Sequence, residues 1–236
     1  MLAQRAIVCY TDGTIINKRC SVLKKVLLIG DSIRMGYDKY VKLALEDCAE
    51  VYYPEENCRF TPFVLRYLHD WLGRSGFGED TDCLHWNVGL WDLLELFDDG
   101  PAVPIEMYEF YLHRICRRIK RFFPKAEVIF ATSTPVDEAG YTKPQDVRRE
   151  NRVIEQYNEV AVKVVTQYGF HVNDLYGFLK DKPLSWHSDK THYYTKAATK
   201  ALTDQVLSAI GACIDITPKE IDYTTFFPEN KNEIGF

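Results

Sequence analysis

The chain has 236 residues, of which 46% are hydrophobic and 27% are charged, a composition typical of one globular domain. A net charge of −5 disfavours a nucleic-acid backbone as partner, and no apolar run approaches the roughly 20 residues that span a membrane. Seven scattered cysteines without a Cys-x-x-Cys pair speak against a zinc or redox site and favour a reducing compartment. Because the N-terminus also lacks the apolar core of a signal peptide, the sequence predicts a cytoplasmic protein. We expect neither a metal nor an organic cofactor.

The chain begins with a predicted hairpin. Two β-prone runs flank Thr11-Asp12-Gly13, and Asp-Gly is a frequent hairpin turn because glycine accepts a positive φ. We interpret residues 6–18 as a hairpin appended to the main sheet, within an N-terminal extension over residues 1–23. Since a lone hairpin is marginal in water, we expect it to pair with a sheet edge or a partner subunit, which gives the chain a route to oligomers.

Downstream, short apolar runs alternate with longer segments of helical periodicity. The predicted strands cover residues 24–30, 49–53, 83–88, 127–131 and 170–175. The predicted helices cover residues 35–47, 61–72, 105–122, 154–168 and 193–210. This alternation predicts a parallel sheet with helices on both faces and right-handed crossovers. Since no linker divides the chain, we expect a single α/β domain over residues 1–236, on which the aromatic tail over residues 212–236 packs.

The first core strand ends in Gly30-Asp31-Ser32. Parallel strands present functional residues just past their C-terminal ends, so the Ser32 hydroxyl is expected where an α/β protein keeps its chemistry. A serine hydroxyl is a weak nucleophile at neutral pH and needs a base, together with donors for the oxyanion that forms on an acyl carbonyl. Asp31 is interpreted as a cap of the turn.

His192 is the candidate base among the histidines. Asp189 and His192 are three residues apart at a loop-to-helix junction, so the carboxylate can meet the imidazole Nδ1 and leave Nε2 to take the serine proton. In a doubly wound sheet this loop lies on the same edge as Ser32. His187 is the alternative, but its spacing from Asp189 fits such a pair less well.

Gly30-Asp31-Ser32-Ile33 resembles the opening block of GDSL-type esterases, the SGNH hydrolases, and Asp189-x-x-His192 resembles their last block. The resemblance spans residues 24 to about 209. It implies a flavodoxin-like three-layer α/β/α sandwich with a five-stranded parallel sheet. It also implies that Ser32 is the nucleophile, that His192 is the general base and then acid, and that Asp189 orients His192.

The same resemblance extends to an oxyanion hole. Asn87 matches the asparagine of the family, and Cys58 stands where the family has a glycine. The implied oxyanion donors are the backbone N–H groups of Ser32 and Cys58 and the side chain of Asn87. The sequence departs from the family around the asparagine, where His85 and Val88 replace the usual glycine and aspartate.

Four further residues are candidates for substrate binding. Arg34 and Arg59 are candidates for binding an anionic group, with ion pairing at the rim as the alternative. Trp91 and Trp186 fall near the predicted edge, where their rings could stack on a sugar or pack in the core.

These observations predict a Ser-His-Asp ester hydrolase of the carboxylesterase or acetylesterase type, acting on a small-molecule ester. The family's habits and the aromatic residues favour an acetylated carbohydrate as substrate. Two alternatives stay open: a lysophospholipase-like or thioesterase-like acylhydrolase, and a flavodoxin-like binding module without catalytic activity.

Overall fold

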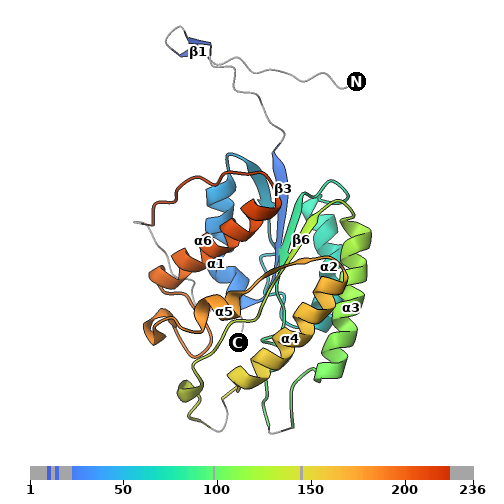
Figure 1. The fold of residues 1–236 in the computed structure, drawn as a ribbon, viewed down its shortest axis with the longest axis vertical. Helices are drawn as coiled ribbons and strands as arrows, with labels where there is room; N and C mark the ends of the chain where they lie inside the picture. The colour runs from blue at the N-terminus through green and yellow to red at the C-terminus, as the bar shows by residue number, and fades with distance from the viewer. Residues whose placement is uncertain (1–9, 12–13, 16–22, 98, 144–145, 224–236) are drawn as a thin grey trace.

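A computed structural model describes residues 10–11, 14–15, 23–97, 99–143 and 146–223, and Figure 1 shows its layered arrangement. The central sheet has five parallel strands in the order β4-β3-β5-β6-β7. The strands are β3 (Lys24–Ile29), β4 (Ala49–Tyr52), β5 (Cys83–Trp86), β6 (Glu127–Ala131) and β7 (His171–Asn173). In chain order this is 2-1-3-4-5, the flavodoxin-like order, so the predicted three-layer sandwich is confirmed.

Helices cover both faces of this sheet. They are α1 (Ser32–Leu45), α2 (Thr61–Ser75), α3 (Ile105–Phe122), α4 (Asn151–Gln167), α5 (Leu175–Leu179) and α6 (Lys196–Cys213). α1 and α6 pack together on one side, and α2, α3 and α4 on the other (Figure 1). Two 3₁₀ turns, η1 (Glu138–Gly140) and η2 (Leu184–Trp186), lie in the connections. Among the described residues, no helix combines the length and apolarity that a membrane span requires.

Two helices begin at other residues than the hydrophobic periodicity predicted, because capping residues determine where they start. α1 begins at Ser32, three residues before the predicted start, because the Asp31 side chain accepts from the Ile33 backbone N–H and caps the helix. α6 begins at Lys196 instead of residue 193, because Thr195 caps it. Tyr193 and Tyr194 are therefore in the segment before the helix, beside the candidate site. The short helix α5, which Asp174 caps, was not predicted.

Both ends of the chain are described in part. Tyr10–Thr11 (β1) and Thr14–Ile15 (β2) pair antiparallel in a separate two-stranded sheet, rather than joining the main sheet. Residues 6–9, 12–13 and 16–18 of the predicted hairpin lie outside the described residues, and its pairing with a partner subunit stays a prediction.

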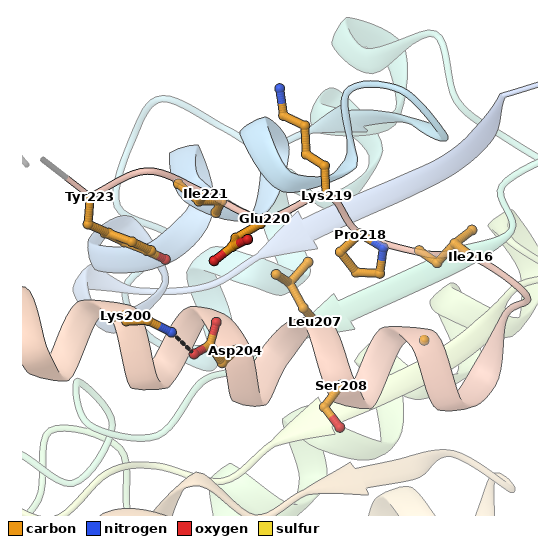
Figure 2. Close-up of a pocket in the computed structure, with 11 residues that line it drawn as sticks. Lys200, Asp204, Leu207, Ser208, Ile216, Pro218, Lys219, Glu220, Ile221 and Tyr223 are labelled. Carbon is orange, nitrogen blue, oxygen red and sulfur yellow. Dashed lines mark hydrogen bonds and ion pairs between the residues drawn. The ribbon is translucent and has the colours of Figure 1, made fainter. Parts of the chain in front are cut away.

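The C-terminal segment crosses α6 and contacts α1. The Lys219 backbone N–H donates to the Ala44 carbonyl at 2.8 Å, and Tyr223 stacks on Tyr40 with ring centroids 5.2 Å apart. Figure 2 shows residues 216–223 above α6, where they enclose a pocket of about 590 Å³. Residues 224–236 of the predicted tail lie outside the described residues.

Candidate active site

Ser32 lies at the topological switch point of the sheet. It follows β3, whose neighbours β4 and β5 are reached by crossovers on opposite sides, and ligands of doubly wound proteins bind at such a point. Ser32 is the first residue of α1, so its backbone N–H has no acceptor within the helix. The Asp31 cap fixes the turn that presents the Ser32 side chain.

The Ser32 hydroxyl meets an oriented imidazole. His192 Nε2 lies 2.8 Å from Ser32 Oγ, and His192 Nδ1 lies 3.0 and 2.9 Å from the two oxygens of Asp189. Since a carboxylate only accepts, Nδ1 carries the proton and Nε2 is the acceptor that faces the serine. The structure therefore brings Ser32, Asp189 and His192 together in the arrangement that sequence reasoning predicted.

The loop itself holds Asp189 in its ionised form. Asp189 Oδ1 accepts the backbone N–H groups of Thr191 and His192, both at 2.8 Å. Burial acts to raise the pKa of Asp189, but the hydrogen bond and charge of His192, together with these N–H groups, hold it below its usual range. A carboxylate that stays ionised can stabilise the imidazolium that forms when His192 takes a proton.

Tyr194 is part of this site, and sequence reasoning missed it. Its ring stacks on the His192 ring with centroids 4.8 Å apart, and its hydroxyl donates to the Ser32 carbonyl at 2.6 Å. A Cβ at Gly36 would lie 2.8 Å from Tyr194 Cε1, so the glycine makes room for this ring. A glycine inside an otherwise regular helix was the available signal for such a close contact.

Asn87 lies beside Ser32 but is already partly engaged. It follows β5, is 3% exposed, and donates through Nδ2 to Asp31 Oδ1 at 2.9 Å. A side-chain amide nitrogen carries two hydrogens, so one remains for a further acceptor. A Cβ at position 30 would lie 1.9 Å from Asn87 Oδ1, which explains the glycine in front of Asp31.

Cys58 does not offer a free backbone N–H, which corrects the predicted oxyanion hole. Its N–H donates to the Gly30 carbonyl at 3.1 Å, and burial raises the pKa of its fully buried thiol to about 11. The next residue, Arg59, takes a φ of 50°, a conformation that favours glycine. The glycine-like position is thus one residue later than expected, and its N–H donates to Asn57 Oδ1 at 2.8 Å.

Arg34 is buried and engaged within the chain rather than open to a substrate, which corrects a second expectation. It is 1% exposed, forms an ion pair with Asp38, and donates to the carbonyls of Pro54 and Glu56 at 2.8 and 2.7 Å. A buried guanidinium with this many acceptors is a structural tie between α1 and the loop that carries Cys58.

The other three predicted substrate-binding residues make different contacts. Arg59 is exposed, with its guanidinium 5.3 Å from the centre of the Phe63 ring. Trp91 lines a pocket of about 260 Å³. Trp186 belongs to η2, and Lys182 Nζ lies 5.5 Å from its ring.

Two other histidines are unsuited to act as the base. His85 is fully buried in β5, its Nε2 lies 3.1 Å from Asn173 Nδ2, and burial lowers its pKa to about 3. His187 packs against Tyr193 with ring centroids 4.1 Å apart, and burial lowers its pKa. Within the described residues, no group of three or more His, Cys, Asp or Glu side chains could hold a metal ion.

No protein-family model matches the chain, and no curated protein matches it either. Solved structures match its fold. The lipase/acylhydrolase from Enterococcus faecalis has a TM-score of 0.65 at 20% identity, covering 84% of this chain and 100% of that chain. A GDSL-like lipase from Bacteroides thetaiotaomicron has a TM-score of 0.63 at 13% identity, with coverages of 81% and 89%. An acetylxylan esterase from Geobacillus stearothermophilus has a TM-score of 0.58 at 16% identity, with coverages of 80% and 94%. The chain therefore has the SGNH hydrolase fold that the sequence motifs implied.

Proposed function

We propose that this chain is a serine ester hydrolase that acts through an acyl-enzyme on Ser32. The observation that carries the proposal is the continuous hydrogen-bonded line from Ser32 Oγ through His192 to Asp189, with contacts of 2.8 and 2.9 Å. A serine, a histidine and a carboxylate in this order supply a nucleophile, a base and a group that fixes the tautomer.

In the first half of the reaction, Ser32 Oγ attacks the ester carbonyl carbon while its proton moves to His192 Nε2. The carbonyl oxygen becomes an oxyanion, for which the Ser32 backbone N–H and the second hydrogen of Asn87 Nδ2 are the proposed donors. When the intermediate collapses, the imidazolium gives its proton to the departing alcohol oxygen. The acyl group is then bound to Ser32 as an ester.

The second half repeats these steps with water. His192 Nε2 takes a proton from water as the water oxygen attacks the acyl carbon, and the same donors hold the oxyanion. Collapse breaks the bond to Ser32 Oγ, which recovers its proton from the imidazolium. The products are one carboxylic acid and one alcohol, and no external oxidant, reductant or metal enters the balance.

We further propose a short acyl group, with an acetylated carbohydrate as the preferred substrate class. One of the similar structures is an acetylxylan esterase, and Trp91 offers an aromatic wall in a pocket near the sheet edge. A pocket of about 260 Å³ is small for a ligand site, which favours a short group over the long chain of a lysophospholipase or thioesterase substrate. We also propose that the protein is cytoplasmic. Five of the described cysteines are free thiols, which a reducing compartment favours.

The test combines active-site labelling with a hydrolysis screen. A fluorophosphonate is expected to label the wild type at Ser32 and to leave Ser32→Ala unlabelled. The wild type is then assayed on acetylated sugars and on p-nitrophenyl esters of increasing chain length. Failure of both labelling and hydrolysis would leave the binding module as the better account. Faster turnover of long-chain esters than of acetates would instead refute the short acyl group.

A further inference from the structure

A small apolar pocket is lined by segments that adjoin the loops of the candidate active site in sequence. Its walls come from the segment after β5 and the segment before α4, which an antiparallel bridge joins through two 3.0 Å hydrogen bonds between the backbones of Glu95 and Arg148. The lining residues are Phe60, Trp91, Leu94, Leu96, Ala102, Val147 and Arg149. Phe60 directly follows the loop of Cys58 and Arg59, and the Trp91 segment directly follows Asn87. The pocket is therefore continuous in sequence with the loops around Ser32.

Arg149 alone is charged among the described residues that line this pocket. It is 6% exposed, and its Nε donates to the Leu90 carbonyl at 2.6 Å. Among the described residues, no carboxylate forms an ion pair with Arg149, and the hydrogen bond that its guanidinium makes is the one from Nε to Leu90. A mostly buried guanidinium that has no opposite charge among the described residues can take an anionic partner from outside the chain.

The charge of Arg149 also acts on Asp31, the carboxyl group next to Ser32. Burial raises the pKa of Asp31, whereas Asn87, the Ile33 N–H, His192 and Arg149 each lower it. Arg149 and His192 thus act on the same carboxyl group beside Ser32. The Nε bond to the Leu90 carbonyl also places Arg149 against the segment that follows Asn87, so a ligand group held at Arg149 lies beside the loop that carries Asn87.

The larger pocket in Figure 2 differs from the Arg149 pocket, because the cations that line it are paired. It has a volume of about 590 Å³, but Lys200 pairs with Asp204 at 2.5 Å and Lys219 pairs with Glu46. Both lysines that line this pocket are therefore paired with a carboxylate of the chain.

We propose that the Arg149 pocket binds a carboxylate carried by the ester substrate, which rests on the proposed function and narrows its substrate class. The planar guanidinium fork matches the geometry of a carboxylate and can bind it through two parallel hydrogen bonds. A phosphate dianion fits less well, because the apolar walls supply no further donors for its second charge. The aromatic walls suit a ring, so an esterified acidic sugar satisfies both the walls and Arg149.

Two pairs of substrates test the proposal and locate the carboxylate. On the alcohol side, 4-acetoxybenzoate is compared with 4-acetoxybenzamide. On the acyl side, the p-nitrophenyl monoester of adipate is compared with p-nitrophenyl hexanoate. A hydrogen bond to a charged group contributes about 1.5–3 kcal/mol, so kcat/KM is expected to favour the carboxylate in one pair by about 10- to 100-fold, mainly through KM.

Variants assign this preference to Arg149. In Arg149→Gln the ratio of the two kcat/KM values is expected to fall to about one, and Arg149→Lys is expected to keep part of it. Arg152→Gln is the matched control, since Arg152 is on the exposed surface beside Glu150. A ratio that survives in Arg149→Gln, or that falls equally in Arg152→Gln, overturns the assignment.

A measurement on the wild type alone covers the case in which the Arg149 variants fail to fold. Benzoate is expected to inhibit p-nitrophenyl acetate hydrolysis competitively, about 10- to 100-fold more tightly than benzamide, and less so at high salt. Equal inhibition by the two, with no preference in either substrate pair, overturns the carboxylate pocket while ester hydrolysis stands. Absence of turnover with every ester is the different result that overturns the proposed function itself.

Discussion

Replacing Asp189 with asparagine is expected to move the proton of the His192 imidazole from Nδ1 to Nε2. Asp189 Oδ1 accepts two backbone N–H groups at 2.8 Å, whereas Oδ2 lies nearest to His192 Nδ1 at 2.9 Å. An asparagine keeps its oxygen on the two N–H groups, so its amide nitrogen then faces Nδ1. Nδ1 must accept, and the proton moves to Nε2, which can no longer take the proton of Ser32.

The contacts of Asp189 also give the magnitude. Turning the amide to restore the tautomer sacrifices two backbone hydrogen bonds, at about 1–3 kcal/mol each, or about 2–6 kcal/mol together. At 1.36 kcal/mol for each factor of ten, turnover is expected to fall by about 30-fold to 10⁴-fold. The upper end matches the loss of about 10⁴ that this change causes in a serine protease triad.

The assay is the initial rate of p-nitrophenyl acetate hydrolysis, with circular dichroism and thermal melting to establish that the variant is folded. Asp189→Ala is the companion variant, because it leaves the backbone N–H groups of Thr191 and His192 without their acceptor and is expected to melt at a lower temperature. A folded Asp189→Asn protein with more than a third of wild-type turnover would refute the proposed role of Asp189.

Three further predictions concern Asn87, Gly36 and Asp92. Asn87→Ala is expected to lower the turnover of p-nitrophenyl acetate by about 10²–10³-fold, and unchanged turnover argues against an oxyanion role. Gly36→Ala places a methyl group 2.8 Å from Tyr194 and is expected to lower turnover by up to about 10²-fold; a higher melting temperature with full activity, as for an ordinary helix site, contradicts this packing. Burial raises the pKa of Asp92 to about 7 from 3.8, so the stability contributed by its neutral form is present at acid pH and is lost as pH rises through about 7. At 1.36 kcal/mol per pKa unit the whole loss is about 4 kcal/mol, spread between pH 3.8 and about 7, and about 3 kcal/mol of it falls between pH 5 and pH 8. Asp92→Asn, which keeps an oxygen for Thr61, should remove this loss in urea unfolding at pH 5 and pH 8; equal pH dependence in both proteins refutes the buried charge.

The sheet and the grouping of Ser32, Asp189 and His192 were predictable because both leave local signals. Strands buried on both faces appear as short apolar runs, and the edge rule for parallel sheets then places Ser32 and the loop of His192 together. The pairing of Asp189 with His192 needs a separation of only three residues, which a sequence displays directly. Helix starts were less accurate, because the caps Asp31 and Thr195 outweighed the hydrophobic period.

The rest of the site depends on contacts that no local pattern records. In the sequence, Arg34 cannot be told from any other helical arginine. Its contacts with the carbonyls of residues 54 and 56 form only in the folded chain. The glycine-like backbone conformation is at Arg59 and not at Cys58, and a positive φ is a backbone property that the identity of the side chain does not reveal. Arg149 lies in an irregular segment with no periodicity, and its burial follows from the bridge between Glu95 and Arg148.

The short separation of Asp189 and His192 has a consequence for how the protein loses activity when warmed. Asp189 and His192, the proposed orienting carboxylate and base, are on one irregular connection before α6, whereas Ser32 follows the end of the core strand β3. A local opening of that connection therefore removes two of the three groups in one event and leaves the sheet intact. We therefore expect activity to be lost reversibly on warming before the helical circular dichroism signal falls, as two separate transitions.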